Sequence, residues 1–234
     1  MPVPDALQQC REMLEGIKGD RKTEAVVHGA LAQLLAMDLQ FDEARGHYRR
    51  GQEILGELGA GIDAHSTSID SGQVELLAGD PAAAARELQR DHDALEALGE
   101  TWLRSTIAAM LGAAKWELGD LDEADRYAAI AKSIADEDDV LSQVLWRATA
   151  ARVQSVMGDI TAAIEIAEAG VKLAAGTEEV GLRADALAAL SFVQTRATWN
   201  REARASLDEA LALLNAKGDR ARARLLAPAL TAKG

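Results

Sequence analysis

A six-residue turn motif recurs five times along the chain and limits its possible folds more than any other feature. The clearest copy reads Gly-Asp-Leu-Asp-Glu-Ala and ends at Ala124. The segments on either side of each copy carry apolar residues at the 3.6-residue period of an amphipathic helix. Self-similarity at a fixed period of about 40 residues, with one short turn between two helical segments, predicts an all-α solenoid. The final alanines of the five copies are Ala44, Ala84, Ala124, Ala163 and Ala203, separated by 40, 40, 39 and 40 residues.

The turn is short enough to force the two helices of each unit to run antiparallel. Glycine can close the first helix in the left-handed conformation, and Asp, Thr or Asn can cap the second. These signals predict five helix pairs, which together with a helix at each end form a single domain over residues 1–234. The pairs are expected at 21–58, 62–98, 101–135, 139–175 and 179–216.

The two ends of the chain are expected to differ from the repeats. Residues 1–19 resemble the second helix of a pair whose first helix is missing, which leaves one apolar face without a partner in the array. Either another domain stands upstream or a second copy covers that face in a homodimer. Residues 219–228 predict a helix that stops at Pro228 and caps the last pair. The apolar stripe of the opening helix is Val3, Leu7, Cys10, Leu14 and Ile17.

Composition narrows the functional classes. The net charge of −13 and the pI near 4.8 argue against nucleic-acid partners and against anionic membranes, because both require a cationic surface. Cys10 is the only cysteine, so neither a disulfide framework nor a thiolate metal site is expected. No apolar run approaches the roughly 18 residues that suggest a membrane span, and a cytoplasmic location is expected.

The repeats resemble the tetratricopeptide family, in which small residues stand where the two helices of a pair cross. Here the residues twelve positions before the five anchor alanines are all small. The early tryptophan of that family is absent, and the period exceeds the family's 34 residues by about six. The resemblance implies a right-handed superhelix whose first helices line a concave surface that takes peptides or helices. The small crossing residues are Ala32, Gly72, Gly112, Ala151 and Ser191.

Long units of this kind resemble the degenerate C-terminal repeats of bacterial signalling proteins. In those proteins an ATPase module, often with a class III nucleotide cyclase, precedes the repeats. The run from Asp138 to Arg147 carries most of this resemblance. Within it, we expect a structural role for Trp146 and Arg147, with the indole packed and the guanidinium paired with an acid.

Two positions in each unit, eleven and eight residues before the anchor alanine, would face inward if the superhelix follows the family's geometry. Aromatic and arginine side chains dominate the energetics of protein interfaces. The aromatic members of this set could instead be core residues that fill space between pairs. The predicted partner-binding groove consists of Gln33, Gln73, Trp116, Arg152 and Phe192.

The residues of the chain do not point to catalysis, to a metal or to a cofactor. The sequence lacks a phosphate-binding loop and a zinc-binding histidine pair. Asp91, His92 and Asp93 are adjacent, but neighbours on a helix point about 100° apart and are not expected to share an ion. We therefore predict a non-catalytic protein-interaction module that regulates a bacterial signalling system. The alternative is a small-molecule sensor that regulates an upstream ATPase or cyclase, which a closed pocket with convergent polar groups would favour over an open groove.

Overall fold

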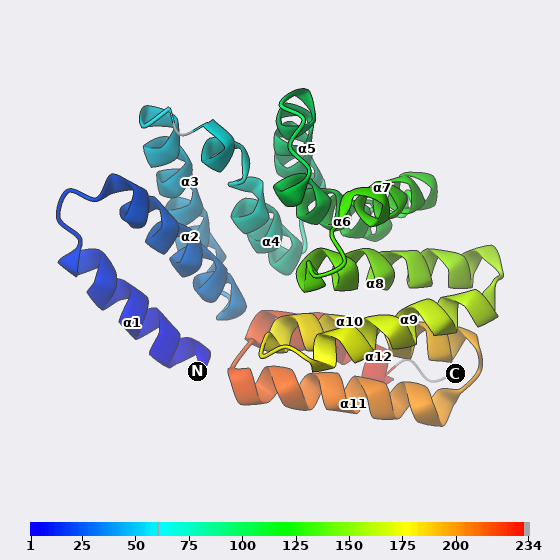
Figure 1. Ribbon diagram of the computed structural model, residues 1–234. Helices are drawn as coiled ribbons and strands as arrows, with labels where there is room; N and C mark the ends of the chain where they lie inside the picture. Colours follow the sequence, from blue (N-terminus) through cyan, green and yellow to red (C-terminus); the bar gives the residue numbers. More distant parts are fainter. Residues whose placement is uncertain (60, 232–234) are drawn as a thin grey trace.

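The computed structural model describes residues 1–59 and 61–231, so the last three residues of the predicted domain lie outside the described part of the chain. Within that part the fold is helical throughout and contains no strand, which confirms the predicted α-solenoid (Figure 1). One helix, α1 (Val3–Gly16), precedes five antiparallel pairs and another, α12 (Arg220–Thr231), follows them. The pairs are α2 (Arg21–Met37) with α3 (Phe41–Glu57), α4 (Ser68–Ala78) with α5 (Pro81–Ala97), α6 (Trp102–Glu117) with α7 (Leu121–Ile134), α8 (Val140–Met157) with α9 (Ile160–Ala175), and α10 (Val180–Arg196) with α11 (Asn200–Lys217). No described helix combines the length and apolar character that a bilayer crossing requires.

Three of the five intra-pair turns use glycine and aspartate as the sequence indicates. The glycines adopt positive φ, and each following aspartate accepts a hydrogen bond from the backbone N–H three residues later. This arrangement ends one helix and starts the next within three residues. The glycines are Gly79, Gly119 and Gly158, and the caps are Asp80, Asp120 and Asp159, with oxygen–nitrogen distances of 2.8, 3.4 and 3.0 Å.

The two degenerate turns keep the same backbone without the favoured residues. Leu39 and Thr198 take the glycine's place with φ of 69° and 64°, a region that side chains with a Cβ disfavour. Gln40 and Trp199, in the place of the capping aspartate, accept no side-chain cap hydrogen bond. The packing of neighbouring pairs therefore sets the turn geometry even where the local sequence opposes it.

Small residues allow each pair to cross closely. A Cβ placed on Gly72 of α4 would lie 2.8 Å from the side chain of Leu88 on α5, which is closer than real contacts allow. A Cβ on Gly112 of α6 would lie 3.3 Å from the carbonyl oxygen of Ala124. The anchor Ala124 is itself completely buried. The corresponding small residues of the other pairs, Ala32, Ala151 and Ser191, are also buried, and small side chains at a crossing let two helices approach closely.

The first helix of the second pair starts later than the predicted residue 62. Residues Gly61–His65 form a 3-10 turn, and α4 begins only at Ser68. Asp91, fully buried on α5, accepts a hydrogen bond from the backbone N–H of Ser68 at 2.8 Å and so caps α4 from outside its own segment.

The array closes on itself, because α12 returns to the first pairs. Arg220 of α12 forms an ion pair with Asp38 at 3.0 Å, and Ala221 joins the same apolar core as Val3 and Leu7. Figure 1 shows the N-terminal end of α1 beside the connection between α11 and α12. The face of α1 that we expected to lack a partner is therefore covered in part by the chain itself: Val3 and Leu7 are buried.

The terminal helix is also longer than predicted. α12 continues past Pro228 to Thr231, whereas the sequence suggested that it stops at the proline. Proline fixes φ near the helical value and removes a single N–H donor, so a helix can continue beyond it at the expense of one hydrogen bond.

Substitution of Gly72 and Gly46 by alanine should have opposite effects. We expect Gly72→Ala to lower the free energy of unfolding by about 1–3 kcal/mol, because its Cβ overlaps Leu88. Gly46 lies exposed on α3 with nothing within 4 Å of an added Cβ, so Gly46→Ala should raise it by about 0.5–1 kcal/mol. Urea denaturation followed by circular dichroism measures both. Equal stability of the two variants would contradict the close α4–α5 crossing.

The strained turn at Thr198 predicts a stabilising substitution. Thr198 is exposed, so Thr198→Gly should remove the left-handed penalty and raise the free energy of unfolding by about 1 kcal/mol. Leu39→Gly relieves the same strain but also removes a side chain that packs on the core, so it should give no net gain. Thermal denaturation compares the two, and a Thr198→Gly variant that melts below the wild type would refute the argument.

Candidate functional site

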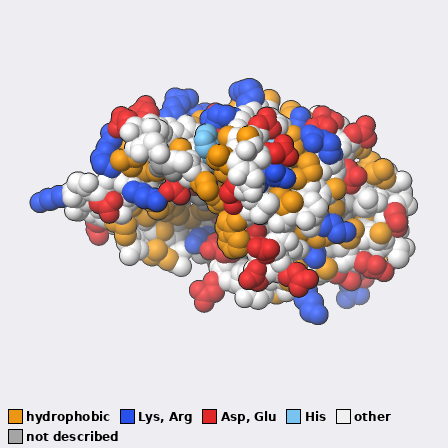
Figure 2. Space-filling view, turned by 45° about the horizontal axis from the view of Figure 1, so that its top comes forward, with side chains coloured by type: hydrophobic (Ala, Val, Ile, Leu, Met, Phe, Trp, Pro, Cys, Tyr) orange, Lys and Arg blue, Asp and Glu red, His pale blue; other side chains and the backbone are white. Residues whose placement is uncertain are grey.

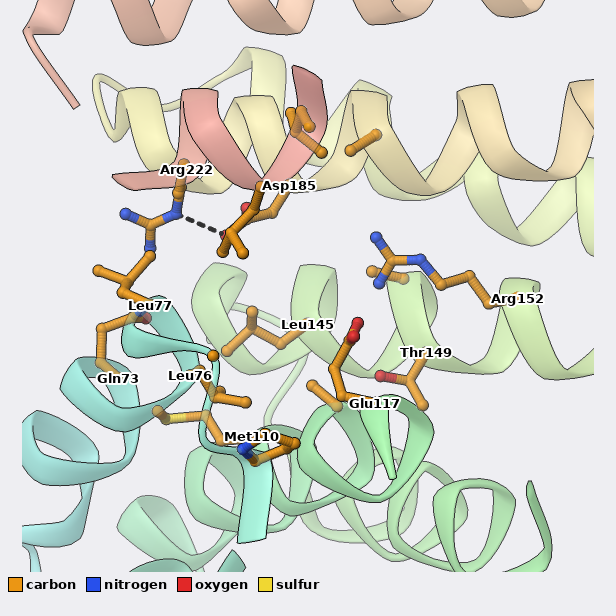
Figure 3. A pocket seen from close by; sticks show the side chains of 17 residues that line it. Gln73, Leu76, Leu77, Met110, Glu117, Leu145, Thr149, Arg152, Asp185 and Arg222 are labelled. Atoms are coloured by element: carbon orange, nitrogen blue, oxygen red, sulfur yellow. Dashed lines mark hydrogen bonds and ion pairs between the residues drawn. The ribbon is translucent and has the colours of Figure 1, made fainter. Parts of the chain in front are cut away.

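A cavity of about 430 Å³ lies between the first helices of four pairs and α12 (Figure 3). The helices α4, α6, α8 and α10 supply one wall each, and α12 closes the remaining side. On the face shown in Figure 2, the surface is hollowed left of centre, with hydrophobic side chains along the recess. Concave sites of about 300–1,000 Å³ typically hold small ligands or short segments.

The cavity combines apolar walls with a few charged groups. Apolar walls provide burial, whereas isolated polar groups orient a guest. The charged side chains come from three different pairs and from α12, which brings together residues more than a hundred positions apart. The apolar lining includes Leu76, Leu77, Met110, Leu145, Leu225 and Leu226, and the charged residues are Glu117, Arg152, Asp185 and Arg222.

Arg222 is a structural element of the cavity wall. Its nearly buried guanidinium donates to Asp219 at 2.6 Å and to Asp185 at 3.3 Å. Burial alone would lower the pKa of Arg222, but the two carboxylates more than offset that effect and raise it above its ordinary value. The Asp185 contact joins α12 to α10 and thereby holds the closing helix in place, as the dashed line in Figure 3 shows.

The structure brings only two of the five predicted groove residues into this cavity. Gln73 on α4 and Arg152 on α8 both line it. Gln33 instead donates a hydrogen bond to Asp70 of the next pair. The rings of Trp116 and Phe192 meet edge to face with centroids 5.3 Å apart, so these two side chains pack against each other across α6 and α10.

Several lining residues escaped the sequence argument. Thr149 lies one helical turn before the predicted Arg152 on α8, and Asp185 lies two turns before the predicted Phe192 on α10. Each shares a helix face with that residue, so extending the predicted groove along the same faces would have identified both. No comparable signal exists for Arg222, Leu225 and Leu226, because their place in the cavity depends on the closure of the whole array.

The run from Asp138 to Arg147 has a structural role, as expected, although one contact differs. Trp146 is buried and its indole N–H donates to the Gln143 side chain at 3.1 Å. Among the described residues, Arg147 does not pair with an acid: it donates to the Gln143 backbone oxygen at 2.8 Å and stacks on Trp146, with its guanidinium carbon 4.1 Å from the ring centroid. Asp139 caps α8 through the N–H of Ser142.

A different set from the adjacent Asp91, His92 and Asp93 comes together on α5. Ligand atoms of His92, Asp93 and Glu96 lie within 4.8 Å of one another. The two carboxylates already have partners: Asp93 accepts from Gln89 at 2.6 Å, and Glu96 lies 3.4 Å from Arg104. We therefore assign no metal site to this cluster.

Two histidines that are distant in sequence meet between α2 and α3. The Nδ1 atoms of His28 and His47 lie 2.8 Å apart. Burial lowers the pKa of both, and the charge of His47 lowers the pKa of His28 further. Glu24 and Glu43 oppose this shift, whereas Arg50 adds to it.

This pair predicts a loss of stability in mild acid. The folded-state pKa values lie below the ordinary value of 6.5, so the unfolded chain binds more protons and stability falls as the pH drops through 6.5. Replacing His28 with Gln should reduce the loss of the free energy of unfolding between pH 7.5 and pH 5.5, measured by urea denaturation. His65→Gln serves as the control, and an unchanged pH dependence in His28→Gln would contradict the prediction.

Comparisons with known proteins bear on the fold. No protein-family model matches the chain, and no curated protein sequence matches it significantly. Among solved structures, the chain is similar to a Rap protein complexed with Competence and Sporulation Factor (TM-score 0.64, 16% identity, 97% of this chain and 68% of the other). It is also similar to NprR in complex with its cognate peptide NprX (TM-score 0.64, 11% identity, 94% and 64%). A putative kinesin light chain from Podospora anserina with nearly identical TPR-like repeats gives a TM-score of 0.56 at 15% identity (84% and 97%). These similarities establish a tetratricopeptide-like fold.

Proposed function

We propose that this chain is a non-catalytic binding module whose concave cavity holds a short segment of a partner protein or peptide. In this proposal it serves as a regulatory part of a bacterial signalling system, as the resemblance of its long repeats suggests. The observation that carries the proposal is the cavity itself: first helices from four pairs converge on one apolar space, and that space contains the Arg152 guanidinium. Arginine beside apolar walls is a frequent anchor in protein recognition.

Similar structures support this choice of ligand class. The Rap structure is a complex with Competence and Sporulation Factor and the NprR structure a complex with its cognate peptide NprX, and both are similar to this chain over nearly its whole length. A cavity lined by first helices offers an extended segment several side-chain sites on successive repeats.

A small-molecule sensor is the second candidate, and one specific observation favours it. Because α12 closes the array, the space available is about 430 Å³, which lies within the range of metabolite pockets. In this case the ligand would change how the module contacts an upstream ATPase or cyclase.

A cavity-filling variant distinguishes binding in the cavity from binding elsewhere. Ala113 of α6 lines the cavity, so Ala113→Trp should fill part of it. Ala129 lies exposed on the second helix of the same pair and outside the cavity, and Ala129→Trp is the matched control. Linear peptides displayed in a random library are selected on the full chain, and the enriched peptides are titrated in solution. We expect binding to the wild type and to Ala129→Trp, with affinity reduced at least about tenfold in Ala113→Trp.

Two other results would reject the proposal. If enriched peptides bind Ala113→Trp as tightly as the wild type, the segment binds outside the cavity. If no peptide is enriched but metabolites raise the melting temperature of the wild type and not of Ala113→Trp, the sensor function replaces it. Circular dichroism of both variants verifies that they remain folded.

A further inference from the structure

The two arginines that line the cavity differ in their partners. Arg222 is bound by two carboxylates, whereas Arg152 makes no ion pair within 4.0 Å and no side-chain hydrogen bond to any described residue. Arg152 is half-buried, and burial lowers its pKa, an effect that Glu117 and Asp185 oppose only from a distance. A guanidinium removed from water without a partner costs free energy that a carboxylate in the cavity would recover.

Glu117 provides an unpaired charge of the opposite sign. It is the last residue of α6, lines the same cavity and forms no ion pair or side-chain hydrogen bond within the described part of the chain. Figure 3 shows the Glu117 carboxylate extending from α6 toward the side of the cavity where Arg152 lies. Among the described residues that line the cavity, the half-buried Arg152 and the exposed Glu117 thus form no ion pair, either with each other or with another side chain.

A buried hydroxyl next to this pair also lacks a partner. Thr149 lies one helical turn before Arg152 on α8 and is completely buried, and its Oγ1 makes no hydrogen bond in the described structure. Three other buried polar atoms of the described residues, Ser68 Oγ, His92 Nε2 and Arg104 Nε, also lack a partner, so the Thr149 hydroxyl does not by itself indicate a guest. Thr149 and Arg152 share one face of α8, which places both donors on the same wall.

We propose that the cavity binds a ligand that carries a carboxylate for Arg152 and a positively charged amino group for Glu117 on an apolar body. This inference rests on the proposed function of the cavity and defines its ligand chemistry. A short peptide with free termini has this chemistry, and so does a free apolar amino acid.

The other charged groups explain why both signs are needed. A ligand with only a negative charge would meet Glu117 and Asp185 in the same space, and a ligand with only a positive charge would meet Arg152 and Arg222. A ligand with both charges can place its carboxylate at Arg152 and its amino group at Glu117, while the apolar lining buries the rest of the molecule.

Matched probes test the two charges separately. The probes are tripeptides of Ala, Leu and Val in four forms: free, N-acetylated, C-terminally amidated, and blocked at both ends. Thermal shifts against the full chain select the best free tripeptide, whose four forms are then titrated by calorimetry. We expect each block to weaken binding about tenfold or more. Leucine, N-acetyl-leucine and leucinamide form the second arm, which distinguishes an amino acid from a peptide.

Substitutions identify the residues that recognise each charge. Arg152→Gln should bind the free tripeptide and its C-terminally amidated form equally. Glu117→Gln should bind the free tripeptide and its N-acetylated form equally. Arg86, exposed on α5 and outside the cavity, provides the control Arg86→Gln, in which all differences should persist.

Several outcomes would overturn the inference. These are equal binding of all four forms, discrimination that survives in Arg152→Gln and Glu117→Gln, or no binding of either the tripeptides or leucine. If displayed segments still bind in the cavity, the proposed function stands and only the charge chemistry fails. If leucine binds through both residues while no peptide does, the charge chemistry stands and segment binding fails.

Discussion

The close crossing of two helices at small side chains is the constraint from which the rest of the structure follows. At Gly72 a single added carbon would collide with Leu88 of the partner helix, and at Gly112 it would make an unusually tight contact with the Ala124 carbonyl oxygen. The helices of a pair therefore take one separation and one angle, and each pair presents nearly the same surface to the next. The geometry is strong enough to hold Leu39 and Thr198 in a backbone conformation that favours glycine.

Because the same geometry repeats, each helix pair is rotated by a small angle relative to the one before, and these rotations add up to the shape of the whole array. After five pairs the accumulated turn brings α12 back to α2 and α4, and the Arg220–Asp38 and Arg222–Asp185 ion pairs fix the closure. The exposed Arg220 pair contributes little, whereas the buried Arg222 cannot lose its carboxylates without leaving a charge unpaired. Closure converts an open groove into a bounded cavity, and it also buries the start of α1.

The local crossing within each pair and the closure of the whole array explain which features could be predicted from the sequence and which could not. Helix pairs, caps and crossings depend on residues close together in the chain, and the repeat period exposes them. Gln73 and Arg152 were found because position within one repeat decides which way a side chain faces. The place of α12 depends on rotations summed over two hundred residues, so its contribution to the cavity has no local signal. Trp116 and Phe192 were assigned to the groove by the same positional rule, yet their rings pack against each other.

Most buried polar groups are satisfied where the helices pack: Asp91 caps α4, and Glu75 binds both Arg45 and Tyr48. A few buried atoms of the described residues lack a partner, namely Ser68 Oγ, His92 Nε2 and Arg104 Nε outside the cavity and Thr149 Oγ1 in its wall. Arg152 differs from these because its unpaired guanidinium lines an open space. The ligand that we propose for the cavity rests on this combination of an unpaired charge and an open apolar space, which the Trp116–Phe192 ring contact does not offer.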